Sequence, residues 1–251
     1  MKQWQRYLAE LFGTFVLAFG GTTVIIASSG LGGGGVQFLV PFGFGFSLLA
    51  ALYAFAEVSG GHFNPQVSLG LFLDRRLSFE DLLGYWIFQF AGGILASLLM
   101  LIPFTHTLVK TTANKPIGGD GRALFLEIAF TAIFVLVILQ STKSDRFAGT
   151  ALVSIPLTLL MIHFALIPFD GCSLNTARSF GPALVGDQWT GFWIFVVGPT
   201  AGAIIGWLVY TVVIKGDTDL RDDMKRIRQD MRASSAKQPP PTGTEPPAAT
   251  G

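Results

Sequence analysis

Charged residues are scarce in this 251-residue sequence: they make up 13% of it, whereas hydrophobic residues make up 51%. Soluble proteins carry about 25% charged residues, so this composition indicates several membrane-spanning segments. The formal net charge is +1, which gives no reason to expect nucleic acid as a partner. The single cysteine, Cys172, excludes an intrachain disulfide. We expect no cleaved secretory signal, because the first apolar run is long enough to remain in the membrane.

Catalytic patterns are also missing from the sequence. Nothing resembles a nucleophile next to a base, and nothing resembles a cluster of metal ligands. We therefore expect a protein that is not an enzyme and that holds neither a metal ion nor a cofactor.

Six apolar stretches are long enough to cross a bilayer, which needs about 20 residues per helix. The Gly-rich break at residues 30–35 divides the first two stretches. The expected spans cover about residues 6–28, 38–58, 82–104, 122–141, 147–167 and 190–214.

An even number of spans puts both termini on one side of the membrane. Of the 17 Lys and Arg residues, 13 fall on the side of the termini. Because cytoplasmic loops carry the excess of Lys and Arg, we expect both termini in the cytoplasm, with the protein integral to the plasma membrane or the cell inner membrane. The four on the other side are Lys110, Lys115, Arg122 and Arg178.

The C-terminal part, residues 216–251, differs from the rest in composition. Asp217–Arg232 is dense in charges of both signs and is compatible with a solvated helix. Residues 233–251 are rich in Pro, Ala, Ser and Thr and have nothing to bury, so we expect a disordered tail there.

Two short segments, Gly60–Val67 and Gly171–Arg178, are distorted copies of each other. Each follows a long apolar run and contains a Gly turn, an Asn and the start of a helical stretch. The apolar tails that follow, residues 67–73 and 179–185, are too short to span a bilayer. Short broken segments at matching places in two halves of a membrane protein indicate a binding or conduction site.

The two halves are repeats of each other. Leu8–Phe15 resembles Phe125–Ala132, and in both a Glu, Glu10 or Glu127, is followed four residues later by Thr. Three spans separate the copies, so the repeats have opposite orientations and their irregular segments meet at the bilayer midplane. The predicted fold is an all-α membrane protein with six transmembrane helices plus two re-entrant half-helices in an inverted repeat. The repeats cover about residues 5–105 and 120–214.

Residues 59–65, Ser-Gly-Gly-His-Phe-Asn-Pro, and 177–183, Ala-Arg-Ser-Phe-Gly-Pro-Ala, complete the pattern. With them, residues 5–214 resemble the aquaporin (major intrinsic protein) family. The family's two Asn-Pro-Ala boxes are altered here to Asn64-Pro65-Gln66 and Asn175-Thr176-Ala177. The resemblance implies a membrane channel that assembles as a homotetramer.

The channel domain is then expected at residues 1–215, followed by the charged segment and tail at 216–251. Each Asn caps a half-helix, and Pro suits the next position because it lacks an N–H. Both positive helix ends face the midplane, where amide donors meet a neutral solute and cations are repelled. Alternatively, both Asn residues are turn caps alone. Gln66 could bond to the second box or protrude into the path, and we expect Gln66→Ala to keep or raise flux.

The resemblance also implies a selectivity filter. Phe44 lies 20 residues before Asn64, His163 lies 12 before Asn175, and Cys172 and Arg178 lie three before and three after Asn175. Phe, His and Arg together resemble the water-selective type, whereas glycerol-conducting members usually have Gly at the position of His163. The alternatives are a core histidine and an arginine that extends to the headgroups.

The resemblance gives the intramembrane carboxylates Glu10 and Glu127 a structural role, as acceptors for backbone N–H groups of the half-helix loops; a proton relay is the alternative. Glu57 and His62 are candidates for the cytoplasmic mouth, where Glu57 is either solvated or titrates and gates the channel. The expected function is passive water conduction that excludes ions and protons. The alternatives are a channel for glycerol, ammonia or peroxide, and a non-conducting membrane scaffold.

Overall fold

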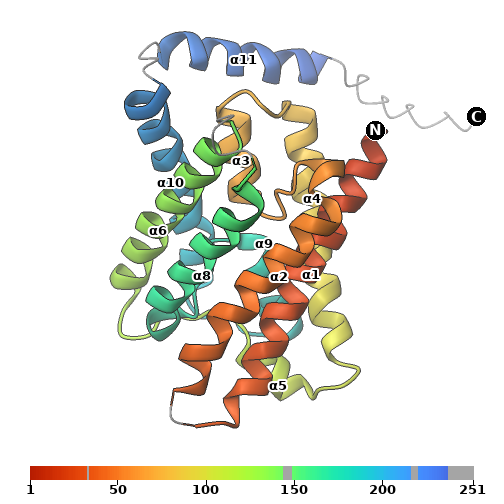
Figure 1. Cartoon of the computed structure of the whole chain (residues 1–251), viewed down its shortest axis with the longest axis vertical. Helices are drawn as coiled ribbons and strands as arrows, with labels where there is room; N and C mark the ends of the chain where they lie inside the picture. The colour runs from red at the N-terminus through yellow and green to blue at the C-terminus, as the bar shows by residue number, and fades with distance from the viewer. Residues whose placement is uncertain (33, 144–148, 216–219, 237–251) are drawn as a thin grey trace, which may run out of the picture.

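The structure is a computed structural model that describes residues 1–32, 34–143, 149–215 and 220–236. Within these ranges every regular element is a helix, and the long helices run side by side along the vertical axis of Figure 1. In chain order the elements are α1 (Gln3–Ser29), α2 (Gly35–Ser59), α3 (Pro65–Leu73), α4 (Phe79–Met100), α5 (His106–Thr111), α6 (Asp120–Ser141), α8 (Ala151–Asp170), α9 (Thr176–Val185), α10 (Ile194–Val209), η1 (Tyr210–Lys215) and α11 (Leu220–Ala236).

The six predicted spans are confirmed. In the part of the chain that the structure describes, six helices are long and apolar enough to cross a membrane, namely α1, α2, α4, α6, α8 and the continuous α10–η1 segment. Their ends differ from the predicted ends by at most four residues. The predicted Gly-rich break separates α1 from α2, where Gly32 and Gly34 have φ angles of 59° and 90°. Glycine adopts this left-handed region without steric penalty, so the chain can reverse there.

The two half-helices lie inside the bundle, between the long helices (Figure 1). α3 has nine residues and α9 has ten, so each is about 15 Å long, half of a bilayer core. α3 packs against α4, α6 and α10, while α9 packs against α4 and α5. The starts of the two half-helices contact each other, which is the arrangement that the inverted repeat predicts.

Corresponding helices of the two repeats pack in corresponding ways: α1 against α4, and α6 against α10. Glycines allow the second contact. A Cβ at Gly202 of α10 would lie 2.5 Å from the carbonyl oxygen of Ile128, and a Cβ at Gly206 would lie 2.5 Å from that of Ala132. Only glycine tolerates backbones this close, so these residues determine how near α10 approaches α6.

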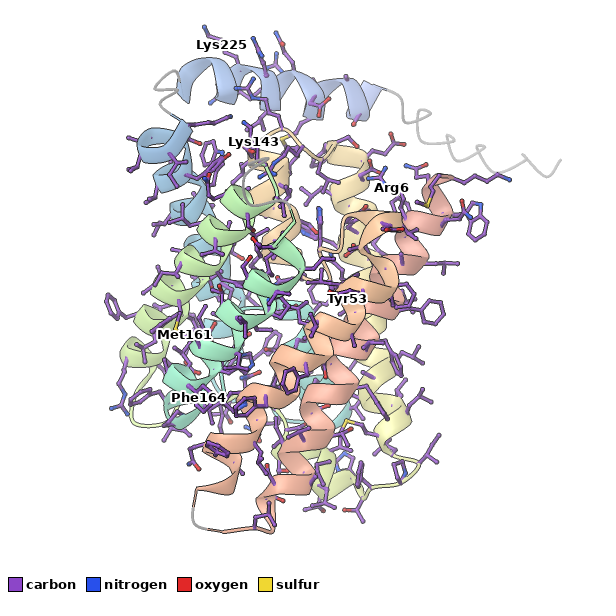
Figure 2. All side chains as sticks on the ribbon, in the orientation of Figure 1. Arg6, Tyr53, Lys143, Met161, Phe164 and Lys225 are labelled. Carbon is purple, nitrogen blue, oxygen red and sulfur yellow. The ribbon has the colours of Figure 1, made fainter. Side chains whose placement is uncertain are left out.

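The N terminus and α11 lie at the same end of the bundle, which we call the terminal face (Figure 1). Arg6, Lys143 and Lys225 are labelled at this end in Figure 2. Aromatic and aliphatic side chains, by contrast, project from the flanks: Tyr53 is 67% exposed and Met161 is 46% exposed. An apolar belt below a charged end suits a protein whose flanks contact lipid.

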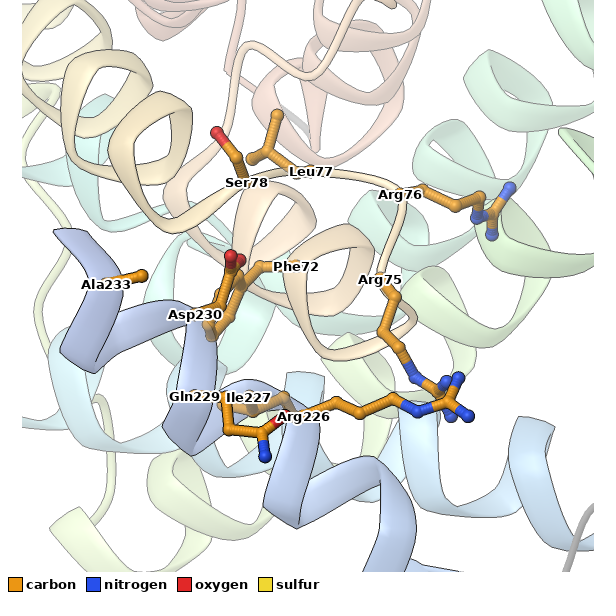
Figure 3. Close-up of a pocket in the computed structure, with 10 residues that line it drawn as sticks. All are labelled: Phe72, Arg75, Arg76, Leu77, Ser78, Arg226, Ile227, Gln229, Asp230 and Ala233. Carbon is orange, nitrogen blue, oxygen red and sulfur yellow. The ribbon is translucent and has the colours of Figure 1, made fainter.

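α11 lies across the terminal face, and Ile227 joins the hydrophobic cluster that contains Phe72 of α3. A cavity of about 550 Å³ separates α11 from the loop after α3, and Arg75, Arg226 and Asp230 are among its lining residues (Figure 3). Residues 233–236, which the sequence placed in a disordered tail, are helical because α11 continues through Ala236. The rest of the expected tail, residues 237–251, lies outside the described residues.

Candidate functional site

Each half-helix begins at an Asn that caps it. The Oδ1 atom of Asn64 accepts the backbone N–H of Gln66 at 2.8 Å, and the Oδ1 atom of Asn175 accepts that of Arg178 at 3.1 Å. Pro65 occupies the first helical position of α3. These bonds satisfy N–H groups that have no partner within their helix. Both helix starts, with their positive ends, are thereby fixed in the interior.

The two caps are joined across the interface between the repeats. The Nδ2 group of Asn64 donates to the carbonyl of Leu174 at 2.9 Å, and that of Asn175 donates to the carbonyl of Phe63 at 2.8 Å. Phe63 and Leu174 have positive φ angles of 50° and 54°, which turn their carbonyls toward the opposite Asn. Each amide uses one N–H in this way and keeps a second N–H for a solute.

The two buried carboxylates hold the loops that present these carbonyls. Glu10 accepts the backbone N–H groups of the two residues before Asn64, and Glu127 accepts those of the two residues before Asn175. The four distances lie between 2.6 and 3.0 Å, and both Glu residues are 0% exposed. Charge-assisted bonds of this kind are about twice as strong as neutral ones. They stabilise the left-handed residues that the loops require.

Two adjacent cavities lie in the interior, and the smaller one reaches the half-helix starts. The one toward the terminal face, which we call the vestibule, has about 200 Å³ and is lined mostly by apolar residues. The second, which we call the constriction, has only about 20 Å³. Leu48, His62 and Phe134 line both cavities. The other residues that line the constriction are Leu17, Phe44, Asn64, Leu159, His163, Ser173, Leu174, Asn175 and Arg178.

Three of the four expected filter side chains meet at the constriction. The rings of Phe44 and His163 are stacked with centroids 4.5 Å apart, and the Arg178 guanidinium carbon lies 4.6 Å from the centroid of Phe44. The Nδ1 atom of His163 lies 2.9 Å from the carbonyl of Leu159. A carbonyl can only accept, so Nδ1 carries the proton and, in the neutral ring, Nε2 remains an acceptor.

Polar atoms at the constriction are left for a solute. Among the described residues, His163 Nε2 and the Nε and Nη2 atoms of Arg178 have no hydrogen-bond partner. The Phe44 ring is an apolar surface beside them. The constriction therefore has one wall that can donate and accept hydrogen bonds and one wall that cannot.

Cys172, the fourth expected filter residue, does not line the constriction, although its neighbours Ser173 and Leu174 do. Its side chain is 0% exposed and belongs to the hydrophobic core, and its backbone N–H donates to Asp170 Oδ1 at 2.8 Å. Sequence spacing located this residue near the filter, but it could not give the direction in which the thiol points.

Asn114, in the segment between α5 and α6, holds Arg178 in place. Its Oδ1 atom accepts bonds from Arg178 Nη1 and, at 2.7 Å, from the hydroxyl of Ser179. Its Nδ2 group donates to the carbonyl of Asp170 at 3.1 Å, and Arg178 Nη1 also approaches the carbonyl of Thr112 at 3.5 Å. Nothing in the sequence marked Asn114, because it lies in a connecting loop without a motif.

Gln66 has the first of the two arrangements that the sequence left open. Its side chain bonds to the second box: Oε1 accepts the backbone N–H of Thr176 at 3.0 Å, and Nε2 donates to the Thr176 hydroxyl at 2.8 Å. Gln66 is 4% exposed and is absent from the residues that line the constriction and the vestibule.

Of the two candidates for the mouth, His62 lines both cavities, whereas Glu57 is exposed and lines neither. His62 Nδ1 lies 3.1 Å from the Ser68 hydroxyl, and its ring meets that of Tyr85 edge to face. The geometry agrees with a solvated Glu57 and leaves His62 as the residue at the junction of the vestibule and the constriction.

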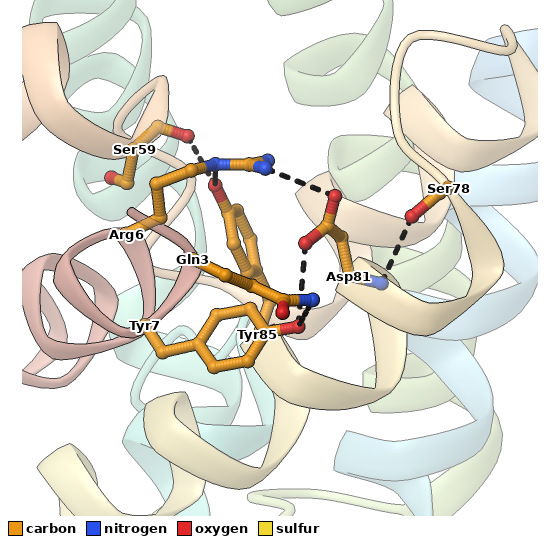
Figure 4. Close-up of polar contacts among 7 residues, drawn as sticks. All are labelled: Gln3, Arg6, Tyr7, Ser59, Ser78, Asp81 and Tyr85. Carbon is orange, nitrogen blue, oxygen red and sulfur yellow. Dashed lines mark hydrogen bonds and ion pairs between the residues drawn. The ribbon is translucent and has the colours of Figure 1, made fainter. Parts of the chain in front are cut away.

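A polar network near the terminal face supports this junction (Figure 4). The hydroxyl of Tyr85 donates to the carbonyl of Ser59, the last residue of α2, at 2.5 Å. Arg6 of α1 donates to the Tyr85 hydroxyl at 3.2 Å and forms an ion pair with Asp81 of α4 at 3.0 Å. Three helices are tied together where the chain enters the loop before α3, a contact that sequence reasoning missed.

Comparison with known proteins agrees with this geometry. Residues 1–210 match the major intrinsic protein family. The chain is 36% identical over 222 residues to Aquaporin Z of Brucella melitensis biotype 1, which covers 83% of this chain and 97% of that protein. It is 37% identical over 213 residues to Glycerol uptake facilitator protein-like 6 of Lactiplantibacillus plantarum, which covers 80% and 94%.

The fold is also similar to the X-ray structure of the aquaglyceroporin from Plasmodium falciparum. The TM-score is 0.77 at 21% identity, and the match covers 85% of this chain and 97% of that chain. The chain belongs to the major intrinsic protein family, whose members are membrane channels for water or small solutes.

Proposed function

We propose that the protein conducts water passively along osmotic gradients and excludes ions and protons. The observation that carries this proposal is the small volume of the constriction, about 20 Å³, in a cavity whose lining includes Phe44, His163 and Arg178. A cavity holds one water molecule when the centre of a water-sized sphere can occupy roughly 10–15 Å³ of it. The constriction therefore admits water in single file and excludes larger solutes.

The polar groups at the constriction suit water. A molecule that leaves bulk water loses hydrogen bonds, and the second N–H groups of Asn64 and Asn175 replace some of them at the midplane. The unpartnered atoms of Arg178 and His163 replace others at the filter. The Arg178 charge and the positive ends of α3 and α9 repel cations, and converging donors orient each water so that a proton wire is interrupted.

The proposal includes the domain limits and the orientation. The channel domain covers residues 1–215, and residues 216–251 form a separate cytoplasmic segment. Both termini lie in the cytoplasm, which is supported by the 13 of 17 Lys and Arg residues on that side. The resemblance to aquaporins supports a homotetramer in a plasma membrane or cell inner membrane.

A channel for glycerol is the second candidate, because one relative is named a glycerol uptake facilitator-like protein and is 37% identical. The stacked rings of Phe44 and His163 argue against it, since together they fill the space that a three-carbon solute requires. The size of the constriction therefore favours water conduction over glycerol conduction.

Stopped-flow light scattering of proteoliposomes tests the proposal. With sucrose as the osmolyte, we expect vesicles that contain the protein to shrink faster than empty vesicles and with a low activation energy. With glycerol, we expect shrinkage without rapid re-swelling. Water flux equal to that of empty vesicles, from protein that is folded by size-exclusion chromatography, would contradict the proposal; rapid re-swelling in glycerol would favour the second candidate.

A further inference from the structure

The two half-helix starts differ from each other at two positions. The inverted repeat aligns Pro65 with Thr176 and Gln66 with Ala177. The second repeat thus has Thr where the first has Pro, and the first repeat has Gln where the second has Ala. The two exceptional residues, Gln66 and Thr176, are the ones in direct contact, and they are 4% and 5% exposed.

The backbone of Thr176 explains why this contact is needed. Thr176 is the first residue of α9, where backbone N–H groups have no partner within the helix. Proline at this position brings no N–H, so Pro65 needs no acceptor. Threonine brings a buried N–H, and Gln66 Oε1 accepts it at 3.0 Å. A buried N–H without an acceptor is strongly unfavourable.

The side chain of Thr176 completes the contact. Its hydroxyl accepts from Gln66 Nε2 at 2.8 Å and donates to the carbonyl of Phe195 in α10 at 2.7 Å. The second amide hydrogen of Gln66 is directed at the Thr200 hydroxyl at 3.4 Å. Only Oε1 can accept the Thr176 N–H, which determines the orientation of the amide.

We propose that Gln66 and Thr176 form a mutually dependent pair that fixes the two half-helix starts relative to each other. Both are positioning residues, because neither lines the constriction. Asn64 precedes Gln66 by two residues and Asn175 directly precedes Thr176. The pair therefore acts with the bonds of the two Asn side chains to Leu174 and Phe63 in setting the spacing of the two amide donors that face the solute. This inference rests on the proposed channel function, and it reverses the expectation from sequence that Gln66→Ala keeps or raises flux.

A double-mutant cycle tests the dependence. Gln66→Ala leaves the Thr176 N–H without an acceptor, and we expect water permeability per folded channel to fall about fivefold or more. Thr176→Pro alone leaves the Gln66 amide without its main partner, and we expect this variant to have a lower water permeability as well. The double variant has neither of these two orphaned groups, although the Phe195 carbonyl loses the Thr176 hydroxyl in it, as it does in Thr176→Pro alone. We therefore expect the double variant to be more permeable than either single variant. Thr176→Ser, which keeps both contacts, is the matched control and should equal wild type.

Permeability and thermal unfolding in detergent are measured for all five proteins. Recovery of both quantities in the double variant supports the pair. Additive losses, or a Gln66→Ala variant with unchanged permeability, would overturn it. If Gln66→Ala does not fold, the double variant still decides: its folding and conduction support the pair, and its failure to fold contradicts it.

The cycle also separates this inference from the proposed function. If the wild type passes glycerol instead of water, glycerol flux replaces water flux as the readout. If it conducts neither, unfolding temperatures still report whether the two residues depend on each other, while the role in spacing the donors fails together with the channel.

Discussion

Asn114 and Arg178 are 64 positions apart in the sequence, and a hydrogen bond between Asn114 Oδ1 and Arg178 Nη1 joins them. Arg178 is 2% exposed and lines the constriction, and its Nε and Nη2 atoms have no hydrogen-bond partner. The position of the charge in the filter therefore depends on a loop outside both half-helices.

Removal of this acceptor is expected to impair the filter. Asn114→Ala leaves Arg178 Nη1 with only the distant carbonyl of Thr112, and an unsatisfied buried donor costs about 1–3 kcal/mol. We expect the guanidinium to move into the narrow space and water permeability to fall severalfold. Thr112→Ala is the control, since it retains that carbonyl. Equal permeability in Asn114→Ala and wild type would show that Arg178 is held by other contacts.

The size of the constriction predicts how selectivity can be changed. His163→Gly with Phe44→Trp removes the stacked pair: it empties the space that the His163 ring fills and takes away one polar group, while position 44 stays aromatic. We expect this double variant to admit glycerol, which re-swelling of vesicles in a glycerol gradient measures. Re-swelling no faster than that of the wild type would mean that other residues limit the solute size.

Replacement of either buried carboxylate by an amide is expected to lower the stability of the protein. Glu10→Gln and Glu127→Gln each leave one acceptor where the carboxylate accepts two backbone N–H groups. Hydrogen bonds to charged groups contribute about 1.5–3 kcal/mol each, so we expect both variants to unfold at lower temperature. Glu57→Gln, at an exposed position, is the matched control. A melting temperature for either buried variant as high as that of the control would remove the structural role.

A larger residue at Gly202 of α10 is expected to disturb the packing of α10 against α6. In Gly202→Val the new Cβ would lie 2.5 Å from the carbonyl oxygen of Ile128 and 2.7 Å from the Cβ of Thr131. Overpacking of this kind costs about 1–3 kcal/mol or more, because α10 must move away from α6. Gly121→Ala, whose Cβ would meet no atom within 4 Å, is the control. The yield of folded protein and its melting temperature measure the difference.

The six spans could be predicted from the sequence because a bilayer requires long apolar helices, and composition alone reveals these. The inverted repeat followed from matching motifs around Glu10 and Glu127, and the half-helix starts followed from Asn64 and Asn175. These are local or periodic signals: capping depends on residues two or three positions away, and repeats depend on order along the chain.

Only the tertiary structure decided how side chains from distant segments meet. The sequence located Cys172 in the filter, but Cys172 is buried in the hydrophobic core and does not line the constriction. From the sequence, Gln66 could either bond to the second box or protrude into the path. In the structure it bonds to Thr176. No sequence signal indicated Asn114. Each outcome depends on the direction of a side chain after helices far apart in sequence have packed, and close packing selects that direction.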